Sequence, residues 1–255
     1  MALCVTQGIV LRSVNYRETS RILTLFSRDL GRLTVSAKGC LRPKSPDRAA
    51  TEMLVAGEYS LSERGGRFTL TAGQLTNAFY PLRMDLDRLA HATYYAQLCE
   101  SVLNDEEPQP ELYDLLDVCL QALCRAEMVG DVVRAFFEVR AMDVLGFRPE
   151  LTACASCGAG VATPQWFSAE SGGVICADCQ PQTPDAKPIL PGTVAFLRQL
   201  LTWESDRIGV LRPTEAVLRD LTETWRPFLR WHLERGYRLD EFLDKLEQSP
   251  HSRQM

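Results

Sequence analysis

Four of the nine cysteines stand in two closely spaced pairs. Two residues separate Cys154 from Cys157, two separate Cys176 from Cys179, and eighteen lie between the pairs. Thiolates at this spacing in a tight turn can occupy adjacent corners of a tetrahedron, and two such turns complete the shell that zinc prefers. The spacing therefore predicts one structural Zn²⁺ ion held by all four cysteines.

Two alternatives for these cysteines are unrelated pairs of free thiols and a redox-active Cys-x-x-Cys motif. A redox motif needs a strand-to-helix junction in a thioredoxin-like unit, and neither pair has that context. Four thiolates also close the coordination shell, so no position remains for a catalytic water. Trp166-Phe167 and Gly172-Gly173 indicate a short hairpin between the pairs. Residues of about 150–184 are thus expected to form a small zinc-ribbon-like insertion.

The other features of the chain favour a reducing compartment. The first residues lack a basic stretch followed by an apolar run, so we expect no signal peptide. No segment approaches the roughly 18 apolar residues of a membrane span, and we expect no membrane partner. Cysteines without an export signal indicate a cytoplasmic protein. Most of the remaining five are expected to be buried small apolar residues, and Cys40 is expected to be exposed in a basic loop.

The N-terminal part of the chain predicts a small β-barrel. Leu33, Val35 and Ala37 alternate with polar residues, as in a strand with one buried face. Five short β-rich segments in about eighty residues suit an OB-fold, whereas a two-sheet sandwich would need more strands. The expected strands are 8–13, 20–26, 32–38, 53–61 and 68–72.

The pattern beyond Pro81 is helical. Asp85 and Asp131 are candidate helix N-caps, and Gly146 with Pro149 supplies a stop signal. The expected fold is therefore α+β: an OB-fold domain over residues 1–81, followed by an all-helical domain over 82–255 that carries the insertion. The expected helices are 85–103, 111–126, 131–145, 191–201 and 213–235, followed by a polar tail at 248–255.

The basic residues are concentrated in the predicted barrel. Residues 1–83 contain twelve Lys or Arg and six Asp or Glu, whereas the remainder carries sixteen basic and twenty-seven acidic residues. Cations interleaved with aromatic side chains can follow a phosphate backbone, although such arginines can also be ordinary solvated surface and most of these aromatics are expected in the core. The candidate residues for binding DNA or RNA are Arg12, Arg17, Arg21, Arg32, Lys38, Arg42, Lys44 and Arg48.

Catalytic signatures are missing from the sequence. It has three histidines, His91, His232 and His251, and no phosphate-binding loop, dinucleotide fingerprint or nucleophile elbow. We therefore expect no catalytic residue and no enzyme activity.

Several stretches taken in order resemble the RecO family of recombination mediators. They are Leu11-Arg12 with Tyr16-Arg-Glu18, Leu25 to Gly31, Lys38-Gly39, Arg42-Pro-Lys-Ser45, Val144 to Pro149, and the two cysteine pairs with Gly172-Gly173. The likeness runs to about Leu201 and weakens beyond it. The loop that begins at Lys38-Gly39 departs from the family pattern: Cys40-Leu41 follows Gly39, and Pro46 follows Ser45.

The resemblance implies a DNA repair and recombination protein. It implies an OB-fold that binds single- and double-stranded DNA, annealing of complementary strands, and zinc ligation by the four cysteines. It also implies partnership with RecR and single-stranded-DNA-binding protein, indirect loading of RecA at gaps, and a nucleoid-associated location. Two other functions stay open from the residues alone: an OB-fold zinc protein that binds RNA, and a protein scaffold.

Overall fold

The computed structural model describes residues 2–233, which divide into two compact units, 2–126 and 127–233. The end of the last predicted helix beyond residue 233, His251 and the polar tail lie outside the described residues. Among the described residues, no helix combines the length and the apolar content needed to cross a membrane.

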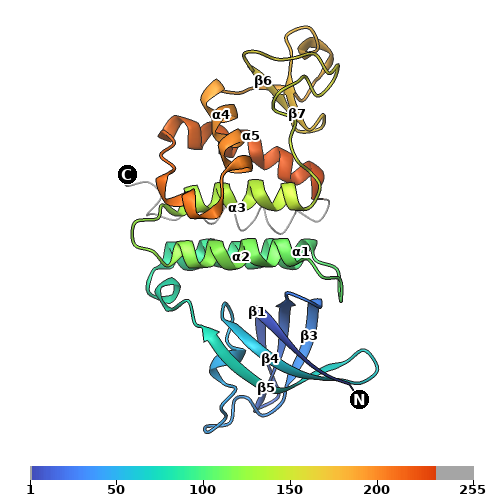
Figure 1. Cartoon of the computed structure of the whole chain (residues 1–255), viewed down its shortest axis with the longest axis vertical. Helices are drawn as coiled ribbons and strands as arrows, with labels where there is room; N and C mark the ends of the chain where they lie inside the picture. Colours follow the sequence, from blue (N-terminus) through green and yellow to red (C-terminus); the bar gives the residue numbers. More distant parts are fainter. Residues whose placement is uncertain (1, 234–255) are drawn as a thin grey trace. The chain divides into compact units, whose positions relative to one another are not determined.

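The first unit contains a closed five-stranded barrel with the order β1-β2-β3-β5-β4 (Figure 1). Its neighbouring strands are antiparallel except β3 and β5, which pair in parallel through Val35 with Phe68 and Ser36 with Thr69. The predicted α+β fold with an N-terminal OB-fold is confirmed. The strands are β1 (Ala2–Tyr16), β2 (Ser20–Ser27), β3 (Gly31–Ala37), β4 (Ala56–Glu63) and β5 (Phe68–Asn77).

The barrel interior follows from the alternation seen in the sequence. Leu33, Val35 and Ala37 of β3 are fully buried, whereas Thr34 between them is exposed. Tyr59 of β4 is also fully buried, and its hydroxyl donates to the Ala50 carbonyl oxygen at 2.8 Å. The inward residues of all five strands form one apolar cluster.

Several strand limits differ from those predicted, and β1 and β5 end later, at Tyr16 and Asn77 rather than at residues 13 and 72. β1 begins at Ala2 rather than near Gly8, because residues 2–9 pair with β4. β4 begins at Ala56 rather than Met53, because Leu54 has a left-handed backbone with φ of 55°. Leu54 instead donates its N–H to the Val10 carbonyl oxygen, and Val10 donates to Val55. The 3₁₀ helix η1 (Ala49–Thr51) precedes this turn.

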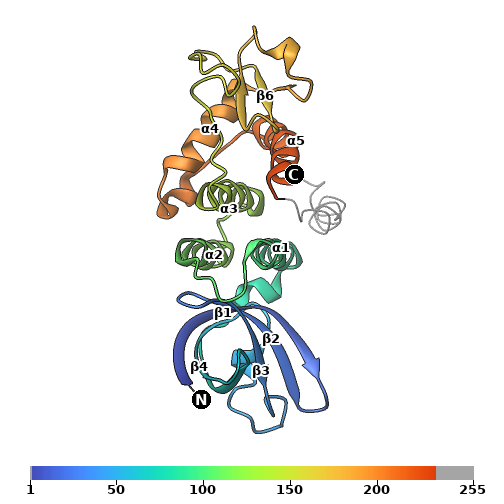
Figure 2. The same cartoon turned by 90° about the vertical axis from the view of Figure 1, so that its right-hand side faces the viewer.

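Helices α1 (Leu86–Val102) and α2 (Pro110–Leu123) belong to the same unit as the barrel and lie side by side against it (Figure 2). The 3₁₀ helix η2 (Tyr80–Met84) leads into α1. Asp85 caps α1 as predicted, accepting the N–H groups of Asp87 and Arg88. The predicted domain boundary between residues 81 and 82 stays a prediction.

The second unit contains α3 (Gly130–Val144), α4 (Pro191–Thr202), η4 (Ser205–Val210) and α5 (Glu215–His232). The cap prediction for Asp131 was wrong: Val129 is the N-cap of α3, and Asp131 lies in the first turn, paired with Arg134 at 3.3 Å. The predicted stop is confirmed. Gly146, with φ of 87°, donates to Asp143, and Phe147 donates to Met142, which is a Schellman motif.

A small three-stranded sheet interrupts the helices of this unit. β6 (Trp166–Ser168) and β7 (Gly173–Ile175) form the predicted hairpin, and β8 (Lys187–Pro188) pairs with the other edge of β6. The 3₁₀ helix η3 (Gln180–Gln182) lies between β7 and β8. A sheet of so few residues needs stabilising contacts beyond its own strand pairing, and the four cysteines lie beside it.

Candidate metal centre and nucleic-acid interface

The first cysteine pair lies in a tight turn between residues 154 and 159. The Cys154 N–H donates to the Ala159 carbonyl oxygen at 2.7 Å, and the Gly158 N–H donates to the Cys154 carbonyl oxygen at 2.8 Å. Gly158 has φ of 76°, a left-handed conformation that glycine adopts without strain. The turn thus brings Cys157 back beside Cys154.

The second pair follows directly from β7. The Cys176 carbonyl oxygen accepts the N–H groups of Cys179 and Gln180 at 3.2 and 3.0 Å. The Cys176 N–H donates to the Cys154 sulfur at 3.3 Å and so ties the two turns together. The hairpin between the pairs therefore sets the separation of the two turns.

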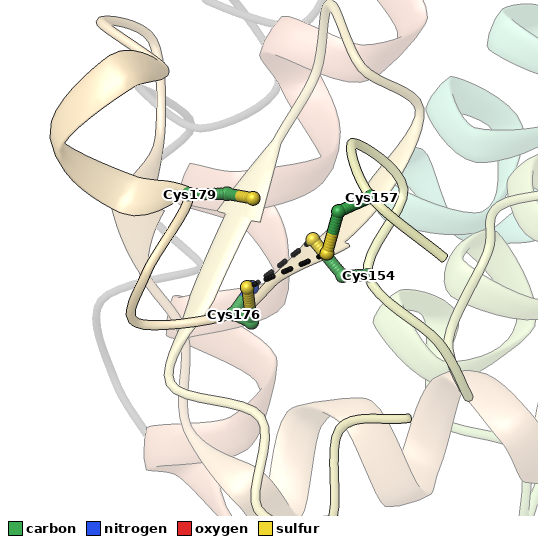
Figure 3. Close-up of side chains that lie close together, drawn as sticks. All are labelled: Cys154, Cys157, Cys176 and Cys179. Carbon is green, nitrogen blue, oxygen red and sulfur yellow. Dashed lines mark hydrogen bonds between the residues drawn. The ribbon is translucent and has the colours of Figure 1, made fainter. Parts of the chain in front are cut away.

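The four side chains converge from these two turns (Figure 3). All four Sγ atoms lie within 4.8 Å of one another, and those of Cys157 and Cys176 are 3.8 Å apart. With Zn–S bonds of about 2.3 Å, a regular tetrahedron has S···S edges of about 3.8 Å. The four sulfurs are therefore close enough to hold one metal ion.

The four thiols also compete for protons with one another. Burial raises the pKa of Cys154, but the N–H groups of Cys176, Cys157 and Ser156 more than offset this and lower that pKa to about 6. Hydrogen bonding to the sulfurs of Cys176 and Cys157 raises the pKa of Cys179 to about 12. A bound divalent cation would stabilise the thiolate at every position and remove this competition for protons.

Two carboxylates hold the segments around the cysteines, and the sequence analysis had missed both. Glu150 accepts from the Thr152 hydroxyl and N–H and the Ala153 N–H, and these bonds lower the pKa of Glu150 to about 2. Asp185 accepts from the buried Ser168 hydroxyl at 2.8 Å. A carboxylate two residues before a Thr hints at the first arrangement, but no local signal identifies the second.

Three of the eight candidate DNA-binding residues are engaged within the first unit. Arg32 donates to Asp105 and to the Glu100 carbonyl oxygen, both at 2.8 Å. Arg12 lies 3.0 Å from the Glu100 carboxylate. Arg21 is 8% exposed and donates to the Glu52 carboxylate at 2.8 Å and to the Thr51 hydroxyl at 3.1 Å. Arg21 and Arg32 are thus held within the fold, whereas the Arg12 side chain is 60% exposed despite its partner.

The other five candidates are exposed: Arg17, Lys38, Arg42, Lys44 and Arg48. Among the described residues, no salt bridge occupies any of their side chains. They lie on two adjoining segments, since the Leu41 N–H donates to the Thr19 carbonyl oxygen at 3.0 Å and the Gly39 N–H donates to the Ser20 hydroxyl at 3.3 Å. The turn at Arg17 and the loop that follows β3 thus form one surface, which we name the basic surface.

The exposure expected for Cys40 was wrong. Cys40 is 2% exposed and joins the apolar cluster inside the barrel. The backbone bond from Leu41 to Thr19 folds the start of the loop against the β1–β2 turn, so that Cys40 faces inward. Most aromatic residues of the barrel region are buried as expected, but Tyr16 is 48% exposed and Tyr80 is 64% exposed.

Comparison with known proteins accounts for both parts of the chain. The family model described as "Recombination protein O N terminal" matches residues 1–79, and that described as "Recombination protein O C terminal" matches residues 83–241. The chain belongs to the RecO family. Curated relatives in this family carry the name DNA repair protein RecO.

The similarity to RecO relatives extends over nearly the whole chain. The RecO protein of Desulforudis audaxviator is 37% identical over 94% of this chain and 96% of its own length. That of Pelotomaculum thermopropionicum is 32% identical over 98% of this chain and 97% of its own length. That of Anaeromyxobacter dehalogenans is 34% identical over 94% and 95%, respectively. The family assignment therefore covers the barrel, the helices and the cysteine cluster together.

Proposed function

We propose that this RecO-family DNA repair protein binds single- and double-stranded DNA through the basic surface and anneals complementary strands. The observation that carries the proposal is the division among the arginines of the barrel. Arg12, Arg21 and Arg32 have carboxylate partners, whereas Arg17, Arg42 and their neighbours are exposed. Exposed cations without a partner can neutralise phosphates at little desolvation cost.

Annealing follows from the kind of contact that this surface offers. Flexible lysine and arginine side chains on a loop contact phosphates and leave base edges free. Screening two phosphate backbones in this way lowers their repulsion without blocking base pairing. The excess of acidic residues after residue 83 would keep DNA from binding elsewhere on the chain.

The metal in our proposal is one structural Zn²⁺ ion held by Cys154, Cys157, Cys176 and Cys179. Zinc is favoured because it takes four thiolates in a tetrahedron, and the cluster has four sulfurs within 4.8 Å. When bound, it supplies a cross-link between the two turns. Since four thiolates leave no open position, the centre has no place for a reacting water, which supports a protein that is not an enzyme.

The partners that we propose are those of recombination mediation: RecR, single-stranded-DNA-binding protein and, indirectly, RecA, which would be loaded at gaps. The proposed setting is the cytoplasm in association with the nucleoid, since reduced thiols and a DNA substrate both fit it. Family membership supports these assignments over RNA binding and over a pure scaffold.

The test is annealing of complementary oligonucleotides by zinc-replete protein, followed by fluorescence across a salt series. Wild type should accelerate annealing, and the effect should fade steeply with salt. The double variant Arg42→Glu, Lys44→Glu should weaken DNA binding at least tenfold and reduce the slope of log K against log salt by about 2 units. Arg125→Glu is the matched control, because it reverses an exposed charge beyond α2.

Three outcomes would contradict the proposal. Unchanged affinity of the double variant would remove the loop from the DNA-binding site. Tighter binding to structured RNA than to DNA would favour the RNA alternative. A folded, metal-loaded protein with no salt-dependent binding to any nucleic acid would favour the scaffold.

A further inference from the structure

We propose that one half of the outer face of β1, β2 and β3 binds unpaired DNA bases, with Tyr16 as the residue on which a base stacks. The inference rests on the proposed function and deepens it. The basic surface by itself would hold the backbone of single or double strands alike. A base-binding strip beside it would make the protein favour single strands.

Strand pairing places the residues of this face in successive rows. Val14 of β1 lies opposite Ile22 of β2, which lies opposite Ser36 of β3. Tyr16 lies opposite Ser20 in the next row. All of these side chains point away from the apolar interior, because the alternate residues, such as Leu23 and Val35, form the barrel core.

The opposite half of the same face is already covered by α1, α2 and the segment between them. Phe26 is fully buried and packs edge-on against Tyr113 of α2, with ring centroids 5.4 Å apart. In the next row, the Thr24 hydroxyl donates to Glu100 of α1, and Arg12 pairs with the same carboxylate. Coverage stops at this row.

The uncovered half presents apolar side chains to solvent. Val14 is 50% exposed, Tyr16 is 48% exposed, and Ile22 between them is half-buried. Phe26, Tyr59 and Phe79, by contrast, are each at most 1% exposed. An exposed aromatic residue beside two aliphatic ones on the outer face of the barrel offers a platform for a planar apolar group.

The neighbouring cations indicate which planar group the strip would bind. The Arg17 guanidinium lies over the Tyr16 ring, 5.2 Å from its centroid, so a base that stacks on this ring would displace it toward the phosphates. Lys38 continues the third strand of the face, and Arg42 lies on the loop that packs against the Tyr16 turn. Glu18 is the only acidic residue within that turn. A planar group joined to phosphates is a nucleotide, so the charges favour a nucleic acid over an apolar peptide.

The exposed aromatic ring selects unpaired bases. Bases in a duplex are stacked on one another and paired, so their faces are unavailable to Tyr16, whereas those of a single strand can turn out onto an aromatic ring. Phosphates of the same strand would then reach Arg17, Lys38 and Arg42. We therefore commit to single-stranded DNA as the occupant.

The experiment compares three probes of equal length: oligothymidylate, an abasic deoxyribose-phosphate oligomer, and a duplex. Tyr16→Ala should weaken oligothymidylate binding about tenfold, with binding of the abasic oligomer and the duplex changed less than twofold. Tyr16→Phe should restore the loss, because the ring is retained. Tyr80→Ala is the control, since it removes an exposed aromatic from η2.

An equal loss on oligothymidylate and on the abasic oligomer, or no loss on either, would overturn the base-binding strip. Thermal melting of each variant shows whether the barrel is intact, and Tyr16→Phe keeps the test valid if Tyr16→Ala is unfolded.

If Tyr16→Ala is neutral while Arg42→Glu, Lys44→Glu still loses affinity, the inference fails and the proposed function survives. If wild type binds none of the three probes, the proposed function fails first. Tighter binding to oligouridylate than to oligothymidylate would overturn the assignment to DNA.

Discussion

Arg32 and Asp105 are joined by a hydrogen-bonded ion pair, with Nε of the arginine 2.8 Å from Oδ1 of the aspartate. The same guanidinium donates through Nη1 to the Glu100 carbonyl oxygen at the end of α1. One side chain of β3 thus holds both the end of a helix and the segment that follows it. The barrel and α1 are connected by these polar contacts as well as by apolar packing.

We expect Arg32→Ala to lower the free energy of unfolding by about 1–2 kcal/mol. Because Asp105 is 69% exposed, the ion pair is screened and contributes little, so most of the loss comes from the unpaired Glu100 carbonyl. Urea denaturation measures the change. Arg42→Ala, at an exposed position, should leave stability unaltered and weaken DNA binding instead. If Arg32→Ala instead weakened DNA binding and Arg42→Ala lowered stability, Arg32 would be the DNA-binding residue and Arg42 the structural one.

The features that could be predicted from the sequence are those whose signal is contained in a short stretch of neighbouring residues. The two cysteine pairs impose their own turns, the alternation of Leu33, Val35 and Ala37 identifies a buried strand face, and Asp85 caps a helix that begins directly after it. Each of these signals lies within a few residues of sequence. Local physics therefore sufficed for the existence of the strands and helices and for the two cysteine turns, but not for the closure of the barrel.

The role of each arginine could not be predicted in the same way. Arg32 and Arg42 look alike in the sequence, but the partners of Arg32 come from residues 100 and 105. Cys40 was misplaced for the same reason, since the contact that turns it inward joins Leu41 to Thr19. The long N-terminal half of β1 also depends on pairing with the distant β4. Such contacts are fixed by topology rather than by local pattern.

Substitution of Cys157 should separate metal binding from the rest of the fold. Cys157 is the exposed member of the cluster, so Cys157→Ser removes a ligand with little loss of packing. We expect zinc content to fall from about one per chain to well below one, and cleavage within the insertion to accelerate in limited proteolysis. Cys124→Ser, outside the cluster, is the control. Full zinc content with an unchanged digestion pattern would refute the ligand assignment.

The second unit should lose stability in mild acid through His232. Burial lowers the pKa of His232, which packs against Phe228 with ring centroids 4.4 Å apart. The unfolded chain therefore binds a proton more readily than the folded chain. The contribution of neutral His232 to stability is complete above the ordinary pKa of about 6.5 and is lost as the pH falls below it.

Melting temperatures of wild type and His232→Gln between pH 8 and pH 5.5 test this prediction. The wild type should lose more stability over this range than the variant, because glutamine does not titrate. The metal centre is common to both proteins, so its own acid sensitivity cancels in the difference. Parallel melting curves for the two proteins across the range would show that His232 does not titrate with folding.

Two glycines with nearly the same backbone conformation should differ sharply in their tolerance of a methyl group. Gly31 and Gly66 have φ of 76° and 71°, so alanine at either position costs about 1 kcal/mol of backbone strain. A Cβ at Gly66 would meet nothing within 4 Å, whereas one at Gly31 would collide with the backbone of Glu107. Since backbone cannot rotate away as a side chain can, Gly31→Ala should lower the free energy of unfolding by roughly 3 kcal/mol in all. Chemical denaturation of both variants measures the two losses in free energy of unfolding, and their difference is the cost of the collision. Equal losses would mean that the turn between β2 and β3 does not pack against the segment that follows α1.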